Sequence, residues 1–408
     1  ANGVGRVGSD GNANRKIVTR AGVIAAPLVA APVAQDLDHG DAVAELRSLL
    51  AERGQQHVLG RHCRADPDGD RFLPERRCIG AEPSRPLQGD RFGIEGSEAQ
   101  HVTIKTHQSD GVLAERRQAA AERIDQLAAF VKVLVDQAKE AGEAVVPSYT
   151  HVQQAQAVPF AHHLLAYAWM VVRDIDRFED VARRLDVSPL GAGASGGSSL
   201  PLDPAKSAAE LGMAAPFDNS MDAVGSRDLA AEYVWCATQA MVHLSRLSEE
   251  LILWCSSEFG WATFTDDYTT GSSAMPQKKN ADIAELVRGR SAAVIGDLTT
   301  IVTLQKGLPM TYNRDLQDDK RAVFHADDTL AGSLEALGGM VATASFHPPT
   351  PDAWVTALDL AEALVERGVP FREAHHLVGR LVSSLVATGR TLDDLGAGEL
   401  VAFDERFR

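Results

Sequence analysis

The run DLAAEYVWCATQAMVHLSRLSEELILWCSSE, residues 228–258, decides the fold. Its apolar side chains recur at steps of four and three residues, which is close to the 3.5-residue period of long, packed helices. A helix of this length covers about 45 Å, at about 1.5 Å per residue. The repeating side chains are Leu229, Tyr233, Cys236, Ala240, Leu244, Leu247, Leu251 and Trp254. We therefore expect one long helix that buries this stripe against neighbouring helices.

Four further segments have helical periodicity or helix-start signals. The first runs from about residue 112 to 144, and the others are expected at about 158–185, 281–305 and 319–344. In the first segment the repeating apolar side chains are Ile124, Leu127, Val131, Leu134 and Ala138. No convincing strand alternation interrupts these segments. The predicted fold is therefore all-α, with a central bundle of long helices over residues 113–345.

Two regions flank this bundle. Pro-Pro-Thr-Pro at 348–351 marks a boundary, and residues 346–408 are expected to form a small helical C-terminal domain that is truncated. Residues 1–112 are rich in Arg, Gly, Asp and Pro and lack regular periodicity. For this atypical N-terminal region two explanations are open: disorder, or a stretch read out of frame.

The composition restricts the classes of function. The chain has 408 residues, with 40 Lys and Arg against 56 Asp and Glu, so its formal net charge is −16. Such an acidic protein is poorly suited to nucleic acid or anionic membranes, and we expect neither as a partner. Its four cysteines form no C-x-x-C pair, which favours a reducing, cytoplasmic compartment. No metal site is expected, because one group of residues matches no zinc-ligand spacing: His57, His62, Cys63 and Cys78.

Residues 271–280 form the stretch with the most chemistry, Gly-Ser-Ser-Ala-Met-Pro-Gln-Lys-Lys-Asn. Gly271 and Pro276 fix turns, and the loop concentrates two hydroxyls, two ammonium groups and a carboxamide. Such a loop can hold a proton-abstracting oxygen beside cations that stabilise a developing carboxylate charge. A solvated linker without function is the alternative.

This loop closely resembles the signature G-S-S-x-M-P-x-K-x-N of the fumarase/aspartase superfamily. Residues 306–320, Lys-Gly-Leu-Pro-Met-Thr-Tyr-Asn-Arg-Asp-Leu-Gln-Asp-Asp-Lys, resemble the argininosuccinate lyase branch of that superfamily. The resemblance covers about residues 120–408. It implies the all-α fold of the superfamily and a homotetramer with a twenty-helix core, in which three subunits contribute to each active site.

The resemblance also implies the catalytic residues. Ser272 matches the residue that abstracts the proton, and Lys278 matches the residue that stabilises the carbanion. Ser273 is a neighbour that the sequence cannot separate from Ser272. His151, in a T-H-x-Q motif just before a predicted helix, matches the cleft histidine, and Glu285 matches its carboxylate partner. The alternatives are a capping or core histidine and, for Glu285, an exposed ion partner of Arg288.

The remaining positions match substrate contacts of the family. Thr150 and Asn280 match contacts to carboxylates or amides. Three residues of the 306–320 run match contacts to the amino-acid end and the carboxylates of the substrate, and Arg227 matches a residue of the substrate-facing surface. The three are Tyr312, Gln317 and Lys320.

The family pattern fails in two places. Its S-x-R-N-D-Q motif should fall near residues 103–107, which read Thr-Ile-Lys-Thr-His, and Ala281 stands where the family prefers proline. The implied function is argininosuccinate lyase: anti β-elimination of argininosuccinate to fumarate and L-arginine in arginine biosynthesis, without metal or organic cofactor. Two alternatives are open: another lyase of the superfamily, such as adenylosuccinate lyase or aspartase, and a helical homologue with impaired catalysis.

Overall fold

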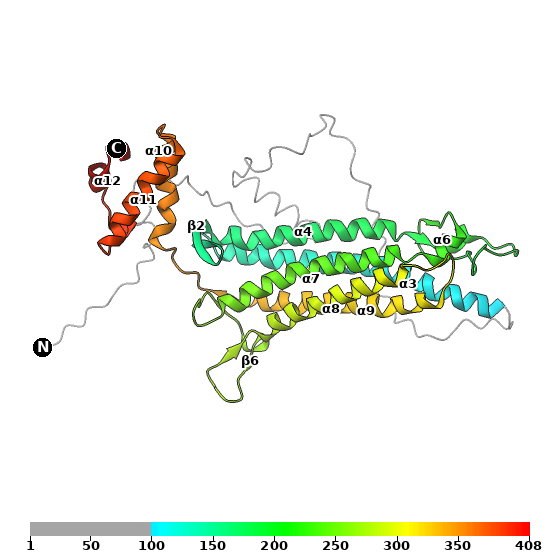
Figure 1. Cartoon of the computed structure of the whole chain (residues 1–408). Coiled ribbons are helices and arrows are strands. Elements are labelled where there is room, and N and C mark those ends of the chain that lie inside the picture. Colours follow the sequence, from blue (N-terminus) through cyan, green and yellow to red (C-terminus); the bar gives the residue numbers. More distant parts are fainter. Residues whose placement is uncertain (1–98) are drawn as a thin grey trace.

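The computed structural model describes residues 99–408, with side chains from residue 113 onward. Its main body is a bundle of long helices that lie side by side (Figure 1). These are α3 (Ala99–Glu140), α4 (Phe160–Arg184), α7 (Asp228–Trp254), α8 (Asp282–Gln305) and α9 (Asp319–Ala342). The prediction of an all-α bundle is thereby confirmed.

The helix boundaries follow the apolar periodicity closely, apart from the two ends of α3. Helix α3 begins at Ala99, about 13 residues before the predicted start, and it ends at Glu140 rather than near residue 144. The expected change of character near residue 112 therefore does not mark a helix start. Residues 42–53, whose apolar side chains on one side favour a short helix, lie outside the described residues. The four residues weighed as zinc ligands lie outside them as well.

The stripe that decides the fold is buried as predicted. Seven of its eight side chains on α7, all except Leu229, are at most 4% exposed, and Leu229 packs against the same core. The phenol ring of Tyr233 meets Phe178 of α4 edge-on, with ring centroids 5.6 Å apart. Full burial of each large apolar side chain contributes about 1.5–3 kcal/mol, so this seam is a main source of cohesion in the bundle.

Short strands occur where the sequence indicated none. An antiparallel hairpin joins β1 (Val145–Thr150) to β2 (Gln153–Pro159). Three further pairs contain two residues per strand: β3 (Val187–Ser188) with β4 (Ala215–Pro216), β5 (Ala262–Thr263) with β8 (Ser345–Phe346), and β6 (Thr270–Gly271) with β7 (Lys279–Asn280). Two-residue strands are too short to give an alternating pattern, and Pro147 together with the bulge beside it breaks the pattern in β1.

The two ends of the bundle differ. One end has the β1–β2 hairpin, and the opposite end has the short helix α6 (Ser220–Gly225) (Figure 1). Helix α5 (Pro204–Glu210) follows β3, and the 3-10 turn η3 (Arg314–Asp318) precedes α9. The turn η2 (Asp266–Tyr268) leads into β6.

The C-terminal helices have apolar cores of their own. They comprise η4 (Ala353–Thr356), α10 (Ala357–Glu366), α11 (Phe371–Ala387), η5 (Leu392–Asp394), α12 (Ala397–Phe403) and η6 (Glu405–Phe407). Leu364 and Leu377 centre one of these cores, and Leu381 and Leu385 the other. The division of the chain at residues 112/113 and 345/346 stays a prediction.

Within residues 99–408, none of the helices has the length and apolar character needed to cross a membrane. The same part of the chain contains no group of three or more His, Cys, Asp or Glu side chains arranged to hold a metal ion.

Candidate active site

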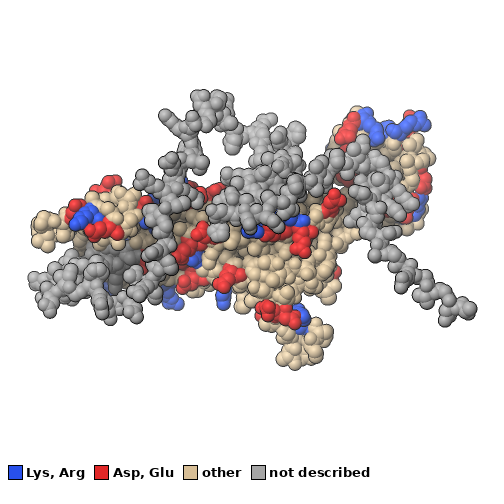
Figure 2. All heavy atoms as spheres, turned by 180° about the vertical axis from the view of Figure 1, so that it is seen from behind, with Lys and Arg blue, Asp and Glu red and all other residues tan. Residues whose placement is uncertain are grey.

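The loop 271–280 is a hairpin that projects from the bundle. Strands β6 and β7 form its stem, and the loop closes with a hydrogen bond from Ser272 N to Lys278 O (3.1 Å). Figure 2 shows this projection below the body of the molecule, with acidic and basic side chains close together near its base. The stem is fixed from two sides. On one side, Lys279 forms an ion pair with Asp266 of η2. On the other side, Tyr268 of η2 packs directly on Gly339 of α9. Any larger residue at position 339 would clash, because its Cβ would lie 2.0 Å from the Tyr268 hydroxyl oxygen.

The geometry around Ser272 favours negative charge on its side-chain oxygen. Oγ accepts hydrogen bonds from two backbone amides, Ala274 N at 3.2 Å and Met275 N at 3.1 Å. Two amide dipoles directed at one oxygen stabilise an alkoxide more than a neutral hydroxyl. The loop therefore provides part of the activation that a serine base needs. Ser273 is exposed beside it.

The two lysines of the loop have different neighbours. Lys278 Nζ donates to the neutral carboxamide oxygen of Asn280 (2.6 Å), and Asn280 Nδ2 donates to Thr270 O (3.2 Å). An ammonium that donates to an amide keeps its full positive charge for an anionic ligand. Lys279 is instead paired with the carboxylate of Asp266.

His151 and Thr150 lie at the tip of the β1–β2 hairpin. His151 and Val152 form its two-residue turn, with φ values of 55° and 59°. Strand β2 lies between His151 and the helix predicted after it, and this helix, α4, begins at Phe160. Both Thr150 and His151 are exposed in the single chain.

Glu285 is exposed in the first turn of α8. Neither Glu285 nor His151 takes part in an ion pair within residues 113–408, so one chain does not bring the two together. Arg288, the alternative partner of Glu285, pairs instead with Glu249 of α7 at 2.5 Å.

A second group of predicted residues gathers at the α6 end of the bundle. Arg227 is 7% exposed, and its Nε lies 2.5 Å from Asp319 Oδ2. Lys320 Nζ lies 3.1 Å from the other oxygen of that carboxylate, and Gln317 Nε2 donates to the Tyr312 hydroxyl (3.0 Å). Two cations share one carboxylate here, which leaves net positive charge for a carboxylate ligand.

Three contributors to these sites were not predicted from the sequence. Asp319 lies within the 306–320 run, directly before the predicted binding residue Lys320, and this position was the available signal. The amides of Ala274 and Met275 gave no signal, because every residue except proline has an amide and only the loop conformation directs these two at Oγ.

The predicted site residues of one chain lie in separate places. The α6 group and the His151 hairpin are at opposite ends of the bundle (Figure 1), and α4, which runs between them, is about 37 Å long at about 1.5 Å per residue. The structure therefore unites Ser272 with Lys278 and Asn280, and Arg227 with Lys320. It does not unite either group with His151 within one chain.

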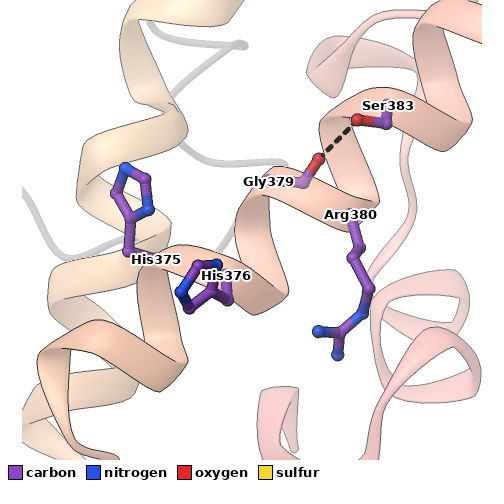
Figure 3. Close-up of a pocket in the computed structure, with 5 residues that line it drawn as sticks. All are labelled: His375, His376, Gly379, Arg380 and Ser383. Carbon is purple, nitrogen blue, oxygen red and sulfur yellow. Dashed lines mark hydrogen bonds between the residues drawn. The ribbon is translucent and has the colours of Figure 1, made fainter.

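An open surface hollow of about 430 Å³ lies elsewhere, on α11. Figure 3 shows its lining residues, His375, His376, Gly379, Arg380 and Ser383, all from that helix. It contains none of the predicted site residues. Both histidines belong to helix α11.

Comparisons with known protein families match two parts of the chain. Residues 107–296 match the family described as "Lyase", and residues 354–408 match the family "Argininosuccinate lyase C-terminal".

Two curated relatives illustrate the similarity. The argininosuccinate lyase of Acidothermus cellulolyticus is 52% identical over 279 residues, which cover 67% of this chain and 57% of that protein. The argininosuccinate lyase of Anaeromyxobacter dehalogenans is 45% identical over 321 residues, covering 76% and 69%. The chain spans less than two thirds of the length of several of these relatives.

Solved structures also resemble this chain. An EDDS lyase in complex with formate is 26% identical with a TM-score of 0.67, over 74% of this chain and 61% of that one. A class II fumarase from Schistosoma mansoni is 17% identical with a TM-score of 0.61, over 74% and 69%, and supports the fold alone. With 45% identity over more than two thirds of a curated relative, this chain belongs to the argininosuccinate lyase family.

Proposed function

We propose that the protein cleaves argininosuccinate to fumarate and L-arginine by anti β-elimination, in arginine biosynthesis. Membership of the argininosuccinate lyase family supports argininosuccinate as the substrate. The observation that carries the proposal is the loop itself, in which two amides stabilise charge on Ser272 Oγ while Lys278 keeps its charge beside Asn280.

In the first step, Ser272 Oγ takes the proton from the substrate carbon next to a carboxylate. The electron pair left on that carbon spreads into the carboxylate, giving an aci-carboxylate with two negative charges. Lys278 and Asn280 stabilise this charge by an ammonium and an amide donor. No metal or organic cofactor takes part in this scheme.

In the second step, the bond between carbon and the guanidino nitrogen breaks, and its electron pair leaves with nitrogen. The nitrogen takes up a proton as it leaves, and fumarate and arginine form. His151, oriented by Glu285, is the candidate for moving that proton through a water molecule. The general acid itself is unassigned.

Substrate recognition is assigned to the remaining residues. Arg227 and Lys320 supply positive charge for carboxylates, while Tyr312 and Gln317 form a hydrogen-bonded pair at the amino-acid end. Thr150, Ser273 and Asn280 are assigned to substrate binding as well, through their short polar side chains. Free thiols at Cys236 and Cys255 suit a cytoplasmic location.

The separation of these groups supports a homotetramer with shared active sites. The outer face of α8 also supports assembly, because residues 292–303 contain a single charged residue, Asp297, which pairs with His325. The exposed residues of this α8 face are Ala292, Ala293, Ile295, Gly296, Thr299, Thr300, Val302 and Thr303. A largely uncharged surface of this kind is typical of an interface between subunits.

The proposal is tested by following fumarate release through its ultraviolet absorbance. Argininosuccinate, adenylosuccinate and aspartate are each offered to the purified protein, and only the first is expected to give fumarate. Ser272→Ala is expected to lower kcat by about 10² to 10⁴-fold while argininosuccinate still binds, because the base is lost and the cations remain. Turnover at the wild-type rate in this variant would refute the role of Ser272.

One observation favours the alternative of an impaired homologue, namely the absence of the S-x-R-N-D-Q motif near residues 103–107. Calorimetric binding of argininosuccinate by the wild-type protein without fumarate release would support that alternative. Release of fumarate from adenylosuccinate or aspartate instead would assign another lyase of the superfamily.

A further inference from the structure

The turn that presents His151 has an unfavourable backbone conformation. His151 and Val152 both lie in the left-handed region, which glycine and asparagine favour and which a β-branched residue such as valine rarely adopts. Val152 is also 72% exposed, so packing of its own side chain does not compensate. Other contacts of the hairpin must therefore hold the turn in place.

The first such contact is the side chain of Tyr149, two residues before His151. Its ring centroid lies 6.0 Å from that of Phe259 and 5.9 Å from that of Trp261. Trp261 in turn stacks on Trp254 of α7, at 5.8 Å with an angle of 19° between the ring planes. Both tryptophans are at most 4% exposed, so Tyr149 rests on a rigid part of the core.

The second contact crosses the hairpin to the C-terminal segment. Tyr149 pairs with Gln154 in the register of β1 and β2, and the Gln154 carboxamide oxygen accepts a hydrogen bond from Asp352 N (2.9 Å). The Asp352 carboxylate accepts from Trp354 N (3.1 Å) and caps η4, against which β2 packs. Gln154 therefore links the hairpin to the start of the C-terminal helices.

The side chains of Tyr149 and Gln154 also interact with each other. Partial burial raises the pKa of the Tyr149 phenol, and a hydrogen bond from the Gln154 side chain acts in the opposite direction. This contact links Tyr149 on β1 to Gln154 on β2, close to the turn.

We propose that Tyr149 and Gln154 are positioning residues for His151: the Tyr149 ring fixes β1 on the aromatic core, and the Gln154 carboxamide fixes β2 to Asp352. The part of this inference that concerns catalysis rests on the proposed function. The part that concerns the order of the hairpin does not.

Hydrogen exchange with mass spectrometry tests the structural part in the full chain. Tyr149→Ala is expected to speed amide exchange in peptides covering 145–159 by about tenfold or more, whereas Tyr149→Phe keeps the ring and leaves exchange near the wild-type rate. Peptides from α9 are expected to be unchanged in both variants. Unchanged exchange at 145–159 in Tyr149→Ala would overturn the inference.

Kinetics test the catalytic part. Displacement of His151 in Tyr149→Ala is expected to lower kcat by about 10 to 100-fold with little change in KM, and Tyr149→Phe is expected to restore most of kcat. Gln154→Ala is expected to give a smaller loss of the same kind. Phe371→Ala, which removes a similar exposed ring from α11, serves as the matched control with wild-type kcat.

The outcomes separate this inference from the proposed function. If the wild-type protein does not cleave argininosuccinate, the proposed function fails, and hydrogen exchange still decides whether Tyr149 orders the hairpin. If the wild-type protein is active and Tyr149→Ala retains its kcat, the positioning role is wrong although the function stands.

Discussion

Val152 combines a left-handed backbone, a β-branched side chain and 72% exposure at the tip of the hairpin beside His151. The left-handed conformation costs roughly 1–2 kcal/mol for a residue other than glycine. Strain of this kind persists only where the surroundings impose it, and it is typical of functional sites. A single substitution at Val152 therefore tests whether the turn is strained.

Val152→Gly is expected to stabilise the protein by about 0.5–1 kcal/mol. Relief of the left-handed strain outweighs the extra chain entropy that glycine gives the unfolded state, which is about 0.5–1 kcal/mol. The measurement is the urea midpoint of unfolding. Val145→Gly, in the strand of the same hairpin, is the control and is expected to destabilise. A lower midpoint for Val152→Gly would contradict this reading of the turn.

The two described cysteines are expected to differ in reactivity. Burial raises the pKa of the Cys236 thiol to about 12, and it raises that of the half-buried Cys255 thiol as well. Because the thiolate is the reactive form, an alkylating reagent at pH 8 should modify Cys255 well before Cys236. Stability should also fall as the pH rises above about 9, where unfolded thiols ionise and the folded Cys236 does not. Peptide mapping measures the labelling, and faster labelling of Cys236 would contradict the assignment.

Individual site residues were predictable only where a motif carries them. Ser272, Lys278 and His151 stand in strings that resemble a family signature, and the structure gives Ser272 and Lys278 neighbours that suit their implied roles. The two amides at Ser272 Oγ depend on the local conformation of the loop. The contact between Asp319 and Arg227 depends on how segments far apart in the sequence fold together. The spacing of residues in the sequence does not predict these contacts.

Among the secondary-structure elements, the helices could be predicted from the sequence and the strands could not. The helices of the bundle repeat apolar residues over six or more turns, so the signal accumulates, and α7 is the clearest example. The β1–β2 hairpin has a bulge at Pro147 and a turn without glycine, and thus lacks both usual hairpin signals. The early start of α3 was missed because residues 99–112 have no regular apolar pattern.

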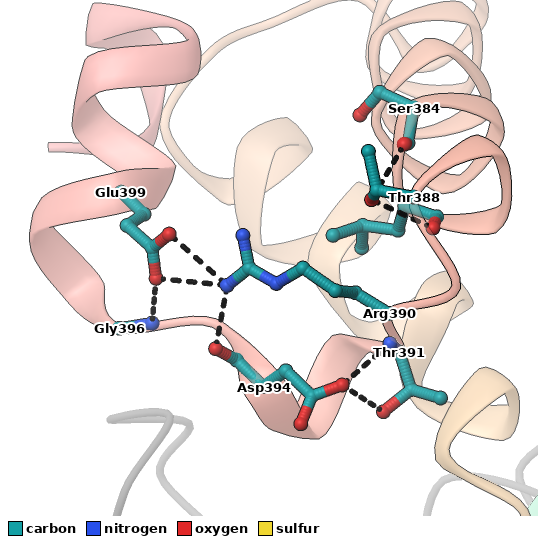
Figure 4. Close-up of polar contacts among 8 residues, drawn as sticks. Ser384, Thr388, Arg390, Thr391, Asp394, Gly396 and Glu399 are labelled. Carbon is teal, nitrogen blue, oxygen red and sulfur yellow. Dashed lines mark hydrogen bonds and ion pairs between the residues drawn. The ribbon is translucent and has the colours of Figure 1, made fainter.

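The last helical elements are held by a polar network that should fail in acid. Arg390 contacts both oxygens of Glu399, and Asp394 accepts hydrogen bonds from the amide and hydroxyl of Thr391 (Figure 4). These contacts lower the pKa values of Asp394 and Glu399, mainly through backbone hydrogen bonds, and the contacts with Arg406 lower that of Asp404 to about 2. A lowered pKa adds stability above the unfolded value, near 4, and this stability is lost as the pH falls through the folded value.

Residues 391–408 should therefore loosen between pH 4 and about 2. Pepsin cleavage mapped by mass spectrometry measures this loosening, with release of the segment expected to increase as the pH falls. In Glu399→Gln the release should begin at a higher pH, because the charged contact with Arg390 is absent throughout. Glu366→Gln, at an exposed position at the end of α10, is the control and should behave as the wild type. Identical release profiles for Glu399→Gln and the wild type would exclude this role for the network.

A single chain contains all the residues of the proposed active site but does not bring them together. The Arg227 group and the His151 hairpin lie at opposite ends of the bundle, and the loop with Ser272 projects from it (Figure 1). Apolar periodicity predicted that α7 would be buried, and it is buried within the single chain. Burial of this α7 stripe therefore gives no evidence about the number of subunits. The exposed and largely uncharged face of α8 is the feature that favours a partner.

Ala293→Arg is expected to break the proposed tetramer. It places a guanidinium on the α8 face, where desolvation without a partner would cost several kcal/mol per subunit. Ala166→Arg, at an exposed position on α4, is the matched control and should leave the mass unchanged. Light scattering after size-exclusion chromatography measures the mass. A wild-type mass for Ala293→Arg would remove α8 from the interface.

The most direct test of the central claim is complementation between two inactive variants. His151→Asn and Ser272→Ala are produced with different tags, co-expressed, and purified as mixed oligomers, and fumarate release from argininosuccinate is measured. If His151 and Ser272 of one site come from different chains, random mixing should restore about one quarter of the wild-type activity, since each intact residue is supplied with a probability of about one half. Mixed oligomers no more active than either variant alone would contradict a site shared between subunits.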